Sequence, residues 1–539
     1  MSNKTIWVYT ATGIVLLLFI SIYLCLSPHV ISIDSVYGFL AYKGTVQTGA
    51  FNVLQDVSPG NVGIMQQHFV AWWSPGQWIF PGALNYLFGW RLGTASILIT
   101  FVFSLSGLFG FYKLYKYFKF PSAIIVLSLL IVVISDTFYD SFIIYQGGEI
   151  LSFGVFPWFL YYLLKLQKYT FNSLLVVLLL FLLCFVAKTT LIIYCSVAIA
   201  YKIFENPLQR FLFSVSKAKE SRRNNKSLKL FIPLIAGTGC IYIFYLDKGI
   251  RPTVLNSFHM ELSDLLIPLA SPLLSILSGQ SATIRFQKLV FGTEVNASFP
   301  ALIFTSAVFL IMAFLVLKCI YKLYNSNEYA VSYKYLLIAF YAGLSIFFII
   351  AYAFDTNIDK SARHFKFLGF LFIPAFLTMV LNRLGKSASL LLTFLFVIYF
   401  LVAFTYSKNK WTRDRYKSVN YFYRNYDNFE KQDRIDEDTY SKLIQLDRKT
   451  PLYIDSKPVL FFFEGNADIA IDIKHLAVFD TEKQKFSTMR YLGNRAKIFL
   501  FLSKETLYKK PDFCRLSFPD YTDFIIVYQN KHFVIMKSQ

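Results

Sequence analysis

The chain has 539 residues, of which 56% are hydrophobic and only 16% are charged, and its mean hydropathy is +0.49. These values are typical of a protein that crosses the bilayer several times, and they exclude an ordinary soluble enzyme with a large core. The formal net charge of +21 does not indicate nucleic-acid binding, because Lys and Arg gather in short polar stretches between alternate apolar runs.

Apolar runs follow one another along residues 1–407, and most are close to the ~20 residues that a membrane-spanning helix needs. The first run lacks a small-residue cleavage site, so a retained helix is expected and not a signal peptide. Basic stretches alternate with loops nearly free of Lys and Arg, which places the N-terminus in the cytoplasm and the C-terminus outside. The eleven predicted spans are 5–27, 91–112, 121–137, 150–166, 171–187, 189–204, 229–247, 298–322, 334–354, 364–382 and 387–406.

The stretch 171–204 can form either one overlong helix or two short helices. In a single helix, Lys188 and the two threonines after it would lie in hydrocarbon, which is energetically costly. Two helices place Lys188 at the outer surface and keep the basic segment 202–229 inside. A helical hairpin with Lys188 at its tip is therefore predicted.

The first region expected outside the membrane is the loop 28–90. Its first amphipathic segment begins at Asp34, directly after the first span, and Ser32 or Asp34 is placed to cap a helix. The carboxylate of Asp34 is thereby expected at the depth of lipid phosphate headgroups. The side of this helix that is expected to face the membrane contains Val36, Tyr37, Leu40 and Ala41.

The second half of this loop, HFVAWWSPGQWIFPGALNYLFGW (68–90), is too broken by Pro and Gly for a span and too aromatic for an ordinary soluble loop. It predicts an interfacial segment, broken by its two prolines. Trp72, Trp73 and Trp78 are expected to anchor it at headgroup depth.

Two further regions are expected on the outer side. The segment 248–297 contains ELSDLLIPLASPLLSILSG, whose pattern predicts a helix lying on the membrane surface. The tail 408–539 changes sharply to charged and polar residues. It opens with a predicted helix (412–447) and continues with the strand-like PLYIDS, VLFFFE, AKIFLFL and the hairpin FIIVYQNKHFVIMK. The predicted fold is a polytopic α-helical membrane module over 1–407 followed by an extracytoplasmic α/β domain.

Five elements then occur in a recognisable order. Asp34 is followed by Tyr37 and Gly49, and an aromatic–proline segment leads into LFGWRLGTASIL. Glu149 opens the fourth span in YQGGEILSFGVFPWFLYYLLK, a lysine forms the hairpin tip in FVAKTTLIIY, and SARHFKFLGFLFIPAFL precedes a late span. Over residues 5–400 this order resembles the GT-C glycosyltransferases, in particular the bacterial protein-mannosyltransferase-like and aminoarabinose-transferase-like members, which use polyprenyl-phosphate sugars.

The sequence departs from that pattern at three places. Ser35 stands where a second acidic residue is common, Ser74-Pro75 replaces the usual Pro-Pro, and Thr189-Thr190 follows Lys188 where relatives often have Gly-Pro. The sugar and the acceptor therefore cannot be carried over from the family.

The resemblance implies roles for the polar residues of the five elements. Sugar transfer needs a base for the acceptor hydroxyl and cations for the leaving phosphate. Asp34 is the candidate base, and Glu149 is the second candidate catalytic carboxylate, which would bind acceptor or sugar hydroxyls. Lys188 and Arg363 are candidate phosphate ligands.

Four further residues complete the predicted substrate-binding set: Tyr37, His68, Trp73 and His364. The two histidines are candidates to share acid–base work. Each candidate also has a purely structural explanation: a helix cap for Asp34, a solvated loop position for Glu149, snorkelling for Lys188 and Arg363, and a hydrogen-bonded structural role for either histidine.

The expected function is therefore a membrane glycosyltransferase, of the inverting type, that transfers a sugar from a polyprenyl-phosphate donor on the outer side of a bacterial cytoplasmic membrane. Its expected partners are that donor, membrane lipids, and a glycan, lipid or protein acceptor. No cofactor is expected, because no paired acidic motif lies near Asp34; a divalent metal between Asp34 and Glu149 is the alternative. The competing functions are a lipid-linked glycan flippase or other transporter, a polysaccharide polymerase or ligase, and a non-catalytic relative.

Overall fold

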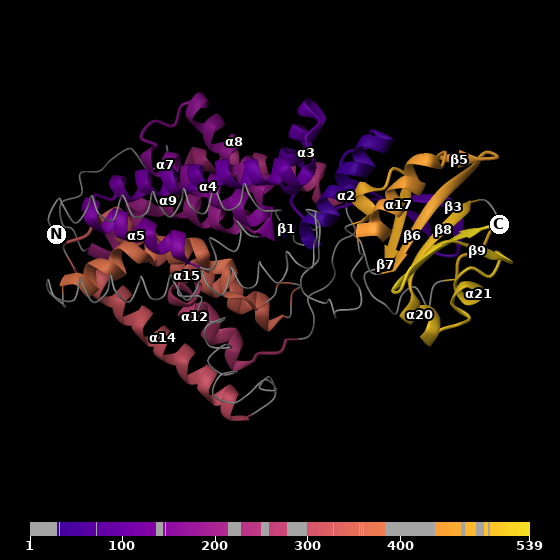
Figure 1. Cartoon of the computed structure of the whole chain (residues 1–539). Helices are drawn as coiled ribbons and strands as arrows, with labels where there is room; N and C mark the ends of the chain where they lie inside the picture. Colours follow the sequence, from indigo (N-terminus) through magenta and orange to yellow (C-terminus); the bar gives the residue numbers. More distant parts are fainter. Residues whose placement is uncertain are drawn as a thin grey trace.

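The structure is a computed structural model in which long helices fill one part of the molecule and a β-sheet lies at the other end (Figure 1). The first and last predicted spans and most of the predicted helix 412–447 lie outside the described residues. The structure describes residues 30–31, 33–71, 73–135, 144–145, 147–213, 228–248, 258–276, 299–326, 328–354, 356, 358, 360–382, 437–464, 469–480, 490–493 and 496–539.

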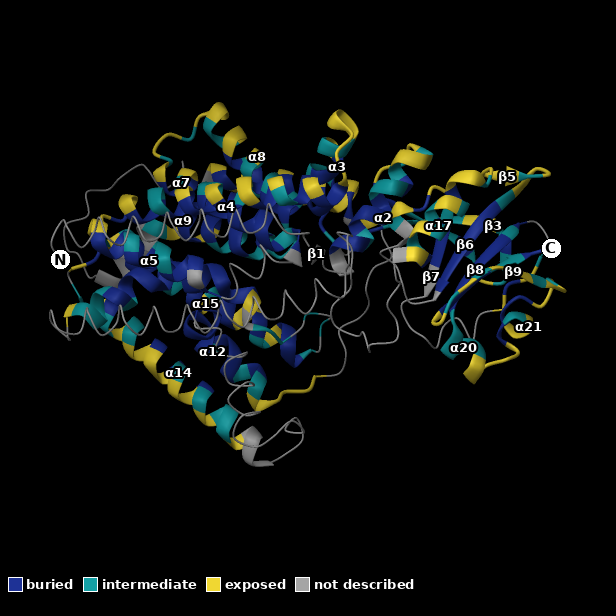
Figure 2. Ribbon diagram, in the orientation of Figure 1, coloured by how far each residue is buried: buried dark blue, intermediate teal, exposed yellow. Residues whose placement is uncertain are grey.

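Four helices among the described residues are long and apolar enough to cross a membrane: α4 (Leu92–Tyr117), α14 (Phe299–Asn325), α15 (Val331–Ala353) and the helix Arg363–Asn382. The chain is a multi-pass membrane protein. The outer side of α14 exposes many large apolar side chains (Figure 2), as a lipid-facing helix does. The other helices of this part are α5 (Ser122–Ile134), α7 (Gly148–Lys165), α8 (Phe171–Ala187), α9 (Leu191–Phe213), α11 (Phe231–Phe244) and α12 (Leu262–Ile276), with short 3₁₀ turns η1 (Leu228–Leu230) and η2 (Leu246–Lys248).

The ambiguous stretch 171–204 forms two helices, as the position of Lys188 predicted. The first, α8, ends at Ala187, and Lys188 has an extended backbone with φ −160° and ψ 126°. The second, α9, begins at Leu191, whose N–H bonds the Lys188 carbonyl at 3.0 Å. Lys188 therefore stands at the tip of the hairpin and outside both hydrogen-bonded helices.

Helices α4 and α7 lie against each other with glycines at their contact. A Cβ atom added to Gly107 would lie 2.3 Å from Cδ1 of Phe153 and 2.5 Å from the Phe153 carbonyl oxygen. On the facing helix, a Cβ atom added to Gly154 would lie 2.5 Å from Cδ1 of Phe103. Small residues allow two membrane helices to approach closely, so these glycines fix the distance between α4 and α7.

Replacing Gly107 with alanine is expected to lower the thermal stability of the purified protein, because the added methyl group would overlap the backbone of α7. Overpacking of this kind costs about 1–3 kcal/mol. The matched control is Gly239→Ala on α11, where nothing lies within 4 Å of the added Cβ. That change is expected to leave the apparent melting temperature unchanged or slightly raised, since alanine favours a helix over glycine. Equal melting temperatures for the two variants would contradict the described α4–α7 contact.

Helix α12 contradicts the prediction of a surface helix within 248–297. Most of α12 is buried, and it packs against α14 and α15. Pro272 has no N–H for the Pro268 carbonyl, and Ser345 Oγ of α15 donates to that carbonyl at 3.3 Å instead. Beside it, the Tyr341 hydroxyl of α15 donates to the Leu269 carbonyl at 3.0 Å. An amphipathic pattern fits a protein interior as well as a membrane surface, which is why the sequence pointed to the wrong place.

The outer loop is more structured than predicted. Helix α2 (Ile33–Thr48) is followed by a hairpin of β2 (Val53–Ser58) and β3 (Asn61–Phe69) and then by α3 (Gly76–Phe88). Val36, Leu40 and Ala41 are buried inside the protein, so the expectation that this side of α2 faces the membrane is wrong.

Trp78 is not an anchor at headgroup depth. Its side chain is 6% exposed, and its indole N–H donates to Asn52 Oδ1 at 2.9 Å. The second proline of the segment, Pro81, lies inside α3 and does not break it. Pro81 has no N–H for the Gln77 carbonyl, and the Tyr145 hydroxyl donates to that carbonyl at 2.9 Å instead.

Residues 437–539 form a six-stranded mixed sheet with short helices. The strand order is β5-β6-β8-β10-β9, and β7 also pairs with β6, along residues 460–464 of that strand. β6 pairs in parallel with β7 and β8, and the other pairings are antiparallel. The elements are α17 (Glu437–Lys449), β5 (Tyr453–Ile454), β6 (Lys457–Glu464), α18 (Ile469–Asp472), β7 (Leu476–Asp480), β8 (Lys497–Ser503), α20 (Lys504–Lys509), α21 (Phe513–Ser517), β9 (Phe524–Gln529) and β10 (Phe533–Ser538).

The four strand-like stretches of the tail fall on β5, β6, β8 and the β9–β10 hairpin. At the hairpin turn, Asn530 Oδ1 accepts the backbone N–H groups of His532 and Phe533 at 2.9 and 2.8 Å. The asparagine side chain thus supplies the turn that the sequence indicated.

The sheet unit (residues 437–539) is held to the outer loop by polar contacts from α2. Lys43 Nζ donates to the His475 carbonyl at 3.0 Å, and Gln47 Nε2 donates to the Lys474 carbonyl at 3.2 Å. Beside them, the N–H of Leu492 bonds the Gly60 carbonyl in the β2–β3 turn at 2.8 Å. α2 therefore connects the sheet unit to the helical part (Figure 1).

Candidate functional site

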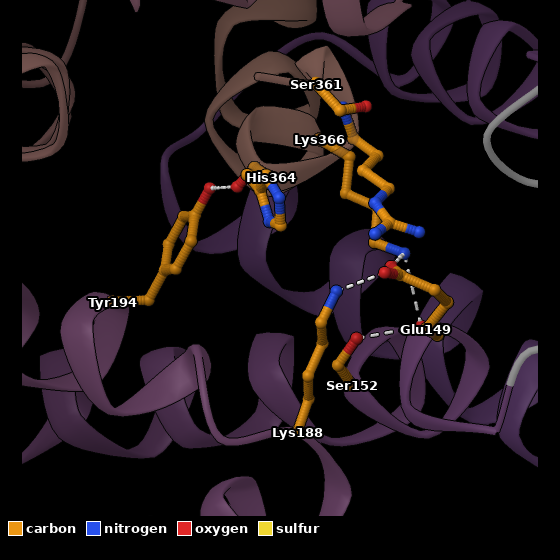
Figure 3. Close-up of polar contacts among 8 residues, drawn as sticks. Glu149, Ser152, Lys188, Tyr194, Ser361, His364 and Lys366 are labelled. Atoms are coloured by element: carbon orange, nitrogen blue, oxygen red, sulfur yellow. Dashed lines mark hydrogen bonds and ion pairs between the residues drawn. The ribbon is translucent and has the colours of Figure 1, made fainter. Parts of the chain in front are cut away.

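The centre of the candidate site is the carboxylate of Glu149, which lies in the first turn of α7. One of its oxygens forms an ion pair with Lys188 from the α8–α9 tip, and the other forms an ion pair with Lys366 from the helix Arg363–Asn382 (Figure 3). The Lys366 Nζ atom also lies 3.3 Å from the Glu149 carbonyl oxygen. Three segments distant in sequence are therefore joined by one acidic group.

The three side chains differ in access to solvent. Lys188 is 18% exposed, whereas Glu149 is 9% and Lys366 is 5% exposed. Lys188 can therefore meet a ligand from outside, and Lys366 lies behind it in the protein. An unpaired charge at the depth of Lys366 would be very costly, so Glu149 is needed as its counter-ion.

A sharp turn brings the start of α7 to this place. Gly147 has φ +38°, and a Cβ atom there would lie 2.4 Å from the Cβ of Gln77 and 3.2 Å from Ser35 Oγ. A side chain on Gly148 would lie 3.1 Å from the Ala187 carbonyl, next to Lys188. The two glycines before Glu149 therefore permit the start of α7 to lie against α2, α3 and the end of α8 at once.

The start of α2 is fixed to the same turn. A short parallel pairing joins β1 (Val30–Ile31) to β4 (Ile144–Tyr145), and Ser35 Oγ donates to the Tyr145 carbonyl at 3.1 Å. Asp34 belongs to the first turn of α2, directly before Ser35, and its side chain lies outside the described part. The backbone at Asp34 is thereby held close to the turn that carries Glu149.

Arg363 and His364 lie on the 3₁₀ turn η4 (Ala362–Phe365), just before Lys366. Ser361 caps this turn by accepting the Arg363 N–H at 3.3 Å, and the Tyr194 hydroxyl donates to the His364 carbonyl (Figure 3). The His364 ring is stacked on Phe348 with 5.6 Å between centroids and is largely buried. Arg363 is exposed, so it is the outermost of the cations at this site.

Two predicted substrate-binding residues, Tyr37 and Trp73, are brought together by the fold. Their rings are stacked with 4.9 Å between centroids and 17° between planes. The Trp73 carbonyl accepts the Tyr245 hydroxyl, which fixes the segment before α3. The chain just after Trp73 lies against the end of α8, because a Cβ atom on Gly76 would lie 2.4 Å from the Val186 carbonyl.

His68 does not belong to this group of contacts. It lies on β3 opposite Leu54 of β2, in the hairpin that reaches toward the sheet unit. There its charge acts on Asp56, whose pKa is raised by desolvation and lowered in part by the Val57 N–H and by His68. The structure therefore separates His68 from the Glu149 centre.

The site holds more positive than negative charge. Lys188, Lys366 and Arg363 stand around the single carboxylate of Glu149 in the described part of the chain, and they suit an anionic ligand. Both oxygens of Glu149 are already bound by ammonium groups, which does not fit a metal ligand. Within the described ranges, no three His, Cys, Asp or Glu side chains gather closely enough to hold a metal ion.

Sequence reasoning missed Lys366, although it follows His364 by two positions in the quoted SARHFKFLGF segment. A lysine inside an apolar run signals a buried partner, and the nearest candidate on the same face was Glu149.

No known family profile and no curated protein matches the sequence. The chain is similar in structure to ArnT from Cupriavidus metallidurans bound to undecaprenyl phosphate, with 12% identity, a TM-score of 0.46, and coverage of 100% of this chain and 98% of that one. It is also similar to the archaeal oligosaccharyltransferase AglB from Archaeoglobus fulgidus in complex with an inhibitory peptide and a dolichol-phosphate, with 11% identity, a TM-score of 0.47, and coverage of 100% and 75%. Scores and identities this low carry no conclusion about activity.

Proposed function

We propose that the chain is a membrane glycosyltransferase that takes a sugar from a polyprenyl-phosphate donor on the outer side of the cytoplasmic membrane. The observation that carries this proposal is the pairing of Lys188 and Lys366 with one carboxylate, on which the charge of Arg363 also acts, beside the first turn of α2. The order of sequence motifs that resembles the GT-C glycosyltransferases supports it independently.

The cations would stabilise the leaving phosphate. When the bond between the sugar C1 and the phosphate oxygen breaks, negative charge grows on that oxygen, and fixed positive charges around it lower the barrier. Arg363 is exposed and would contact the donor first, and Lys188 is placed behind it with partial access. Lys366 would act from the buried side. Glu149 would then be a positioning residue that keeps the two ammonium groups in place.

Asp34 would act as the base for the acceptor hydroxyl. Its place in the first turn of a helix stabilises the ionised carboxylate, which is the form that accepts a proton. A single displacement at C1, with the base on the side opposite the phosphate, would invert the configuration of the sugar. The stacked pair of Tyr37 and Trp73 offers an aromatic face for the sugar ring.

The test is binding of undecaprenyl phosphate to the purified full-length protein, measured by native mass spectrometry in detergent. Arg363→Gln is expected to weaken retention of this lipid about tenfold, since a hydrogen-bonded pair with a charged partner contributes about 1.5–3 kcal/mol. The control is Arg515→Gln, which removes an exposed arginine of the sheet unit that pairs with Asp512 at 3.3 Å. Equal retention by the wild type and the Arg363 variant would remove Arg363 from the proposed phosphate site.

A transporter of lipid-linked glycans is the second candidate. The observation that favours it is the burial of Lys366 and Glu149 among the helices, because transporters place ionisable pairs inside the membrane region. The two functions differ in their product: a transferase yields free polyprenyl phosphate and a glycosylated acceptor, whereas a transporter leaves the donor intact. Mass spectrometry of envelope lipids from a deletion strain and its complemented form separates them.

A further inference from the structure

A second cationic region lies away from the Glu149 centre, in a cleft between α2 and the sheet unit. The cleft has a volume of about 890 Å³, which is in the range of ligand-binding sites. It is bounded by α2, by the corner between α3 and α4, by α17 and by the segment around α18. Its basic lining residues are Lys43, Arg91, Arg448, Lys449 and Lys474.

Among the described residues that line this cleft, Asp472 is the only acidic one. Its carboxylate accepts the Tyr440 hydroxyl at 2.9 Å, and the charges of Lys43 and Arg91 also act on it. Arg448, Lys449 and Lys474 are exposed to solvent at the cleft. Five basic groups around one carboxylate leave a strong excess of positive charge, so the cleft suits an anion.

An exposed apolar tip adjoins this cleft. Two lining residues, Asn85 and Arg91, enclose the tip of residues 86–90, where α3 ends at Phe88 and Gly89 turns the chain with φ +66°. Tyr86, Leu87 and Phe88 are 79%, 68% and 61% exposed, and the end of α3 stands out from the molecule (Figure 2). Such a cluster at a helix end, in a membrane protein, is typical of contact with lipid.

The tip is attached rigidly to the wall of the cleft. The Tyr42 hydroxyl on α2 donates to Asn85 Oδ1 at 2.7 Å, and Asn85 Nδ2 donates to the Trp90 carbonyl at 2.6 Å. One asparagine therefore connects a cleft-lining tyrosine with the far end of the apolar tip. The cations and the apolar surface keep a fixed arrangement, as recognition of a molecule with an anionic head and an apolar tail requires.

We propose that this cleft binds the phosphate headgroup of an anionic phospholipid of the outer leaflet, while the apolar tip contacts its acyl chains. This site is separate from the sugar-transfer centre and does not depend on the function proposed above. The bound lipid would join α2, the α3–α4 corner and α17, so that the sheet unit is held against the membrane surface by a lipid as well as by hydrogen bonds.

The experiment uses the full-length protein in neutral detergent and native mass spectrometry with added lipid. Wild type is expected to retain phosphatidylglycerol at least about tenfold better than phosphatidylcholine, since each basic residue near a lipid surface contributes measurably to anionic lipid binding. The triple variant Arg448→Gln/Lys449→Gln/Lys474→Gln is expected to lose this preference. The control Lys509→Gln/Lys510→Gln/Arg515→Gln also removes three positive charges, but from exposed positions of the sheet unit outside the cleft lining. This control is expected to keep the preference for phosphatidylglycerol.

Two further measurements distinguish a lipid headgroup from a soluble phosphate compound as the ligand of the cleft. Leu87→Ser/Phe88→Ser changes only exposed side chains, so folding is preserved, and retention of phosphatidylglycerol is expected to fall severalfold. If soluble glycerol 3-phosphate displaces phosphatidylglycerol at equal concentration, the site recognises free phosphate compounds and the lipid proposal is overturned. Unchanged retention in the cleft triple variant also overturns it.

The pH dependence provides an independent check. Desolvation raises the pKa of Asp472 to about 6, against the Tyr440 hydrogen bond and the charges of Lys43 and Arg91. Desolvation lowers the pKa of Lys43 to about 8, so Lys43 stays charged below pH 7. Lowering the pH from 7 to 5 therefore removes the negative charge of Asp472 and leaves the positive charge of Lys43 in place. Phosphatidylglycerol retention is expected to rise about threefold, and Asp472→Asn is expected to abolish that rise.

Discussion

Replacing Asp34 with asparagine is expected to lower sugar transfer at least about 100-fold while the protein still folds, because general-base groups typically contribute 10²–10⁴-fold to a rate. Asparagine has the shape of aspartate without its charge, and loss of a charge in the first turn of a helix costs only about 0.3–1 kcal/mol, so α2 should keep its place next to the Tyr145 carbonyl. What is lost is the ability to accept a proton. The measurement is mass spectrometry of envelope glycolipids and glycans in a deletion strain complemented with either form.

The control for this prediction is Asp56→Asn, the same change on β2 of the outer loop. It is expected to restore the wild-type pattern at equal expression. If Asp34→Asn also restores the missing sugar fully, Asp34 is not the base. If the deletion itself changes no glycan or glycolipid, the transferase function is excluded together with its base.

Replacing Glu149 with glutamine is expected both to destabilise the protein and to stop its activity. The change removes the one negative charge between Lys188 and Lys366, and Lys366 is too deeply buried to reach water. Loss of one partner of a buried ion pair costs about 3–5 kcal/mol. The apparent melting temperature in detergent should fall by several degrees, which differential scanning fluorimetry measures. The control Glu205→Gln breaks the more exposed pair with Lys202 at 2.8 Å, and its cost should stay at or below about 1 kcal/mol.

A double variant separates the structural from the functional contribution of this cluster. Glu149→Gln combined with Lys366→Met leaves no unpaired buried charge, so most of the lost stability should return. Sugar transfer should remain absent, because the phosphate site has lost a cation. If stability returns and activity returns with it, the cluster only supports the fold. If stability stays low in the double variant, the ion pair is not the cause of the loss.

Much of the helical part could be predicted because hydrocarbon constrains the sequence strongly. Every predicted span within the described residues falls on a helix, and the cost of placing Lys188 in lipid was enough to divide 171–204 into α8 and α9. The strands of the tail were predictable for a related reason, since their central runs VLFFF (459–463) and IFLFL (498–502) are apolar throughout, as strands buried on both faces are.

What the sequence could not provide is the partner of each amphipathic surface. Trp78 and α12 have the composition of interfacial segments. Within the protein, however, Asn52 Oδ1 accepts the indole N–H of Trp78, and hydroxyl groups of α15 donate to carbonyls of α12. The β2–β3 hairpin was not predicted, because only the amphipathic start of the outer loop and the stretch 68–90 received an assignment. The pairing of Lys366 with Glu149 joins positions 217 residues apart, and no local pattern shows which distant carboxylate a buried lysine will meet.

The separation of these charges along the chain has a consequence for synthesis. Glu149 enters the membrane region first, Lys188 follows 39 residues later, and Lys366 follows 217 residues after Glu149. At a translation rate of about 5–20 residues per second, Lys188 becomes available within about 2–8 s, whereas Lys366 takes about 10–40 s. The carboxylate is therefore neutralised early by the hairpin tip, and the helix that carries Lys366 inserts against a pair that already exists. Closure of the site becomes a late event in the assembly of the nascent chain, and a ribosome that stalls between the two lysines would leave Glu149 with only its first partner.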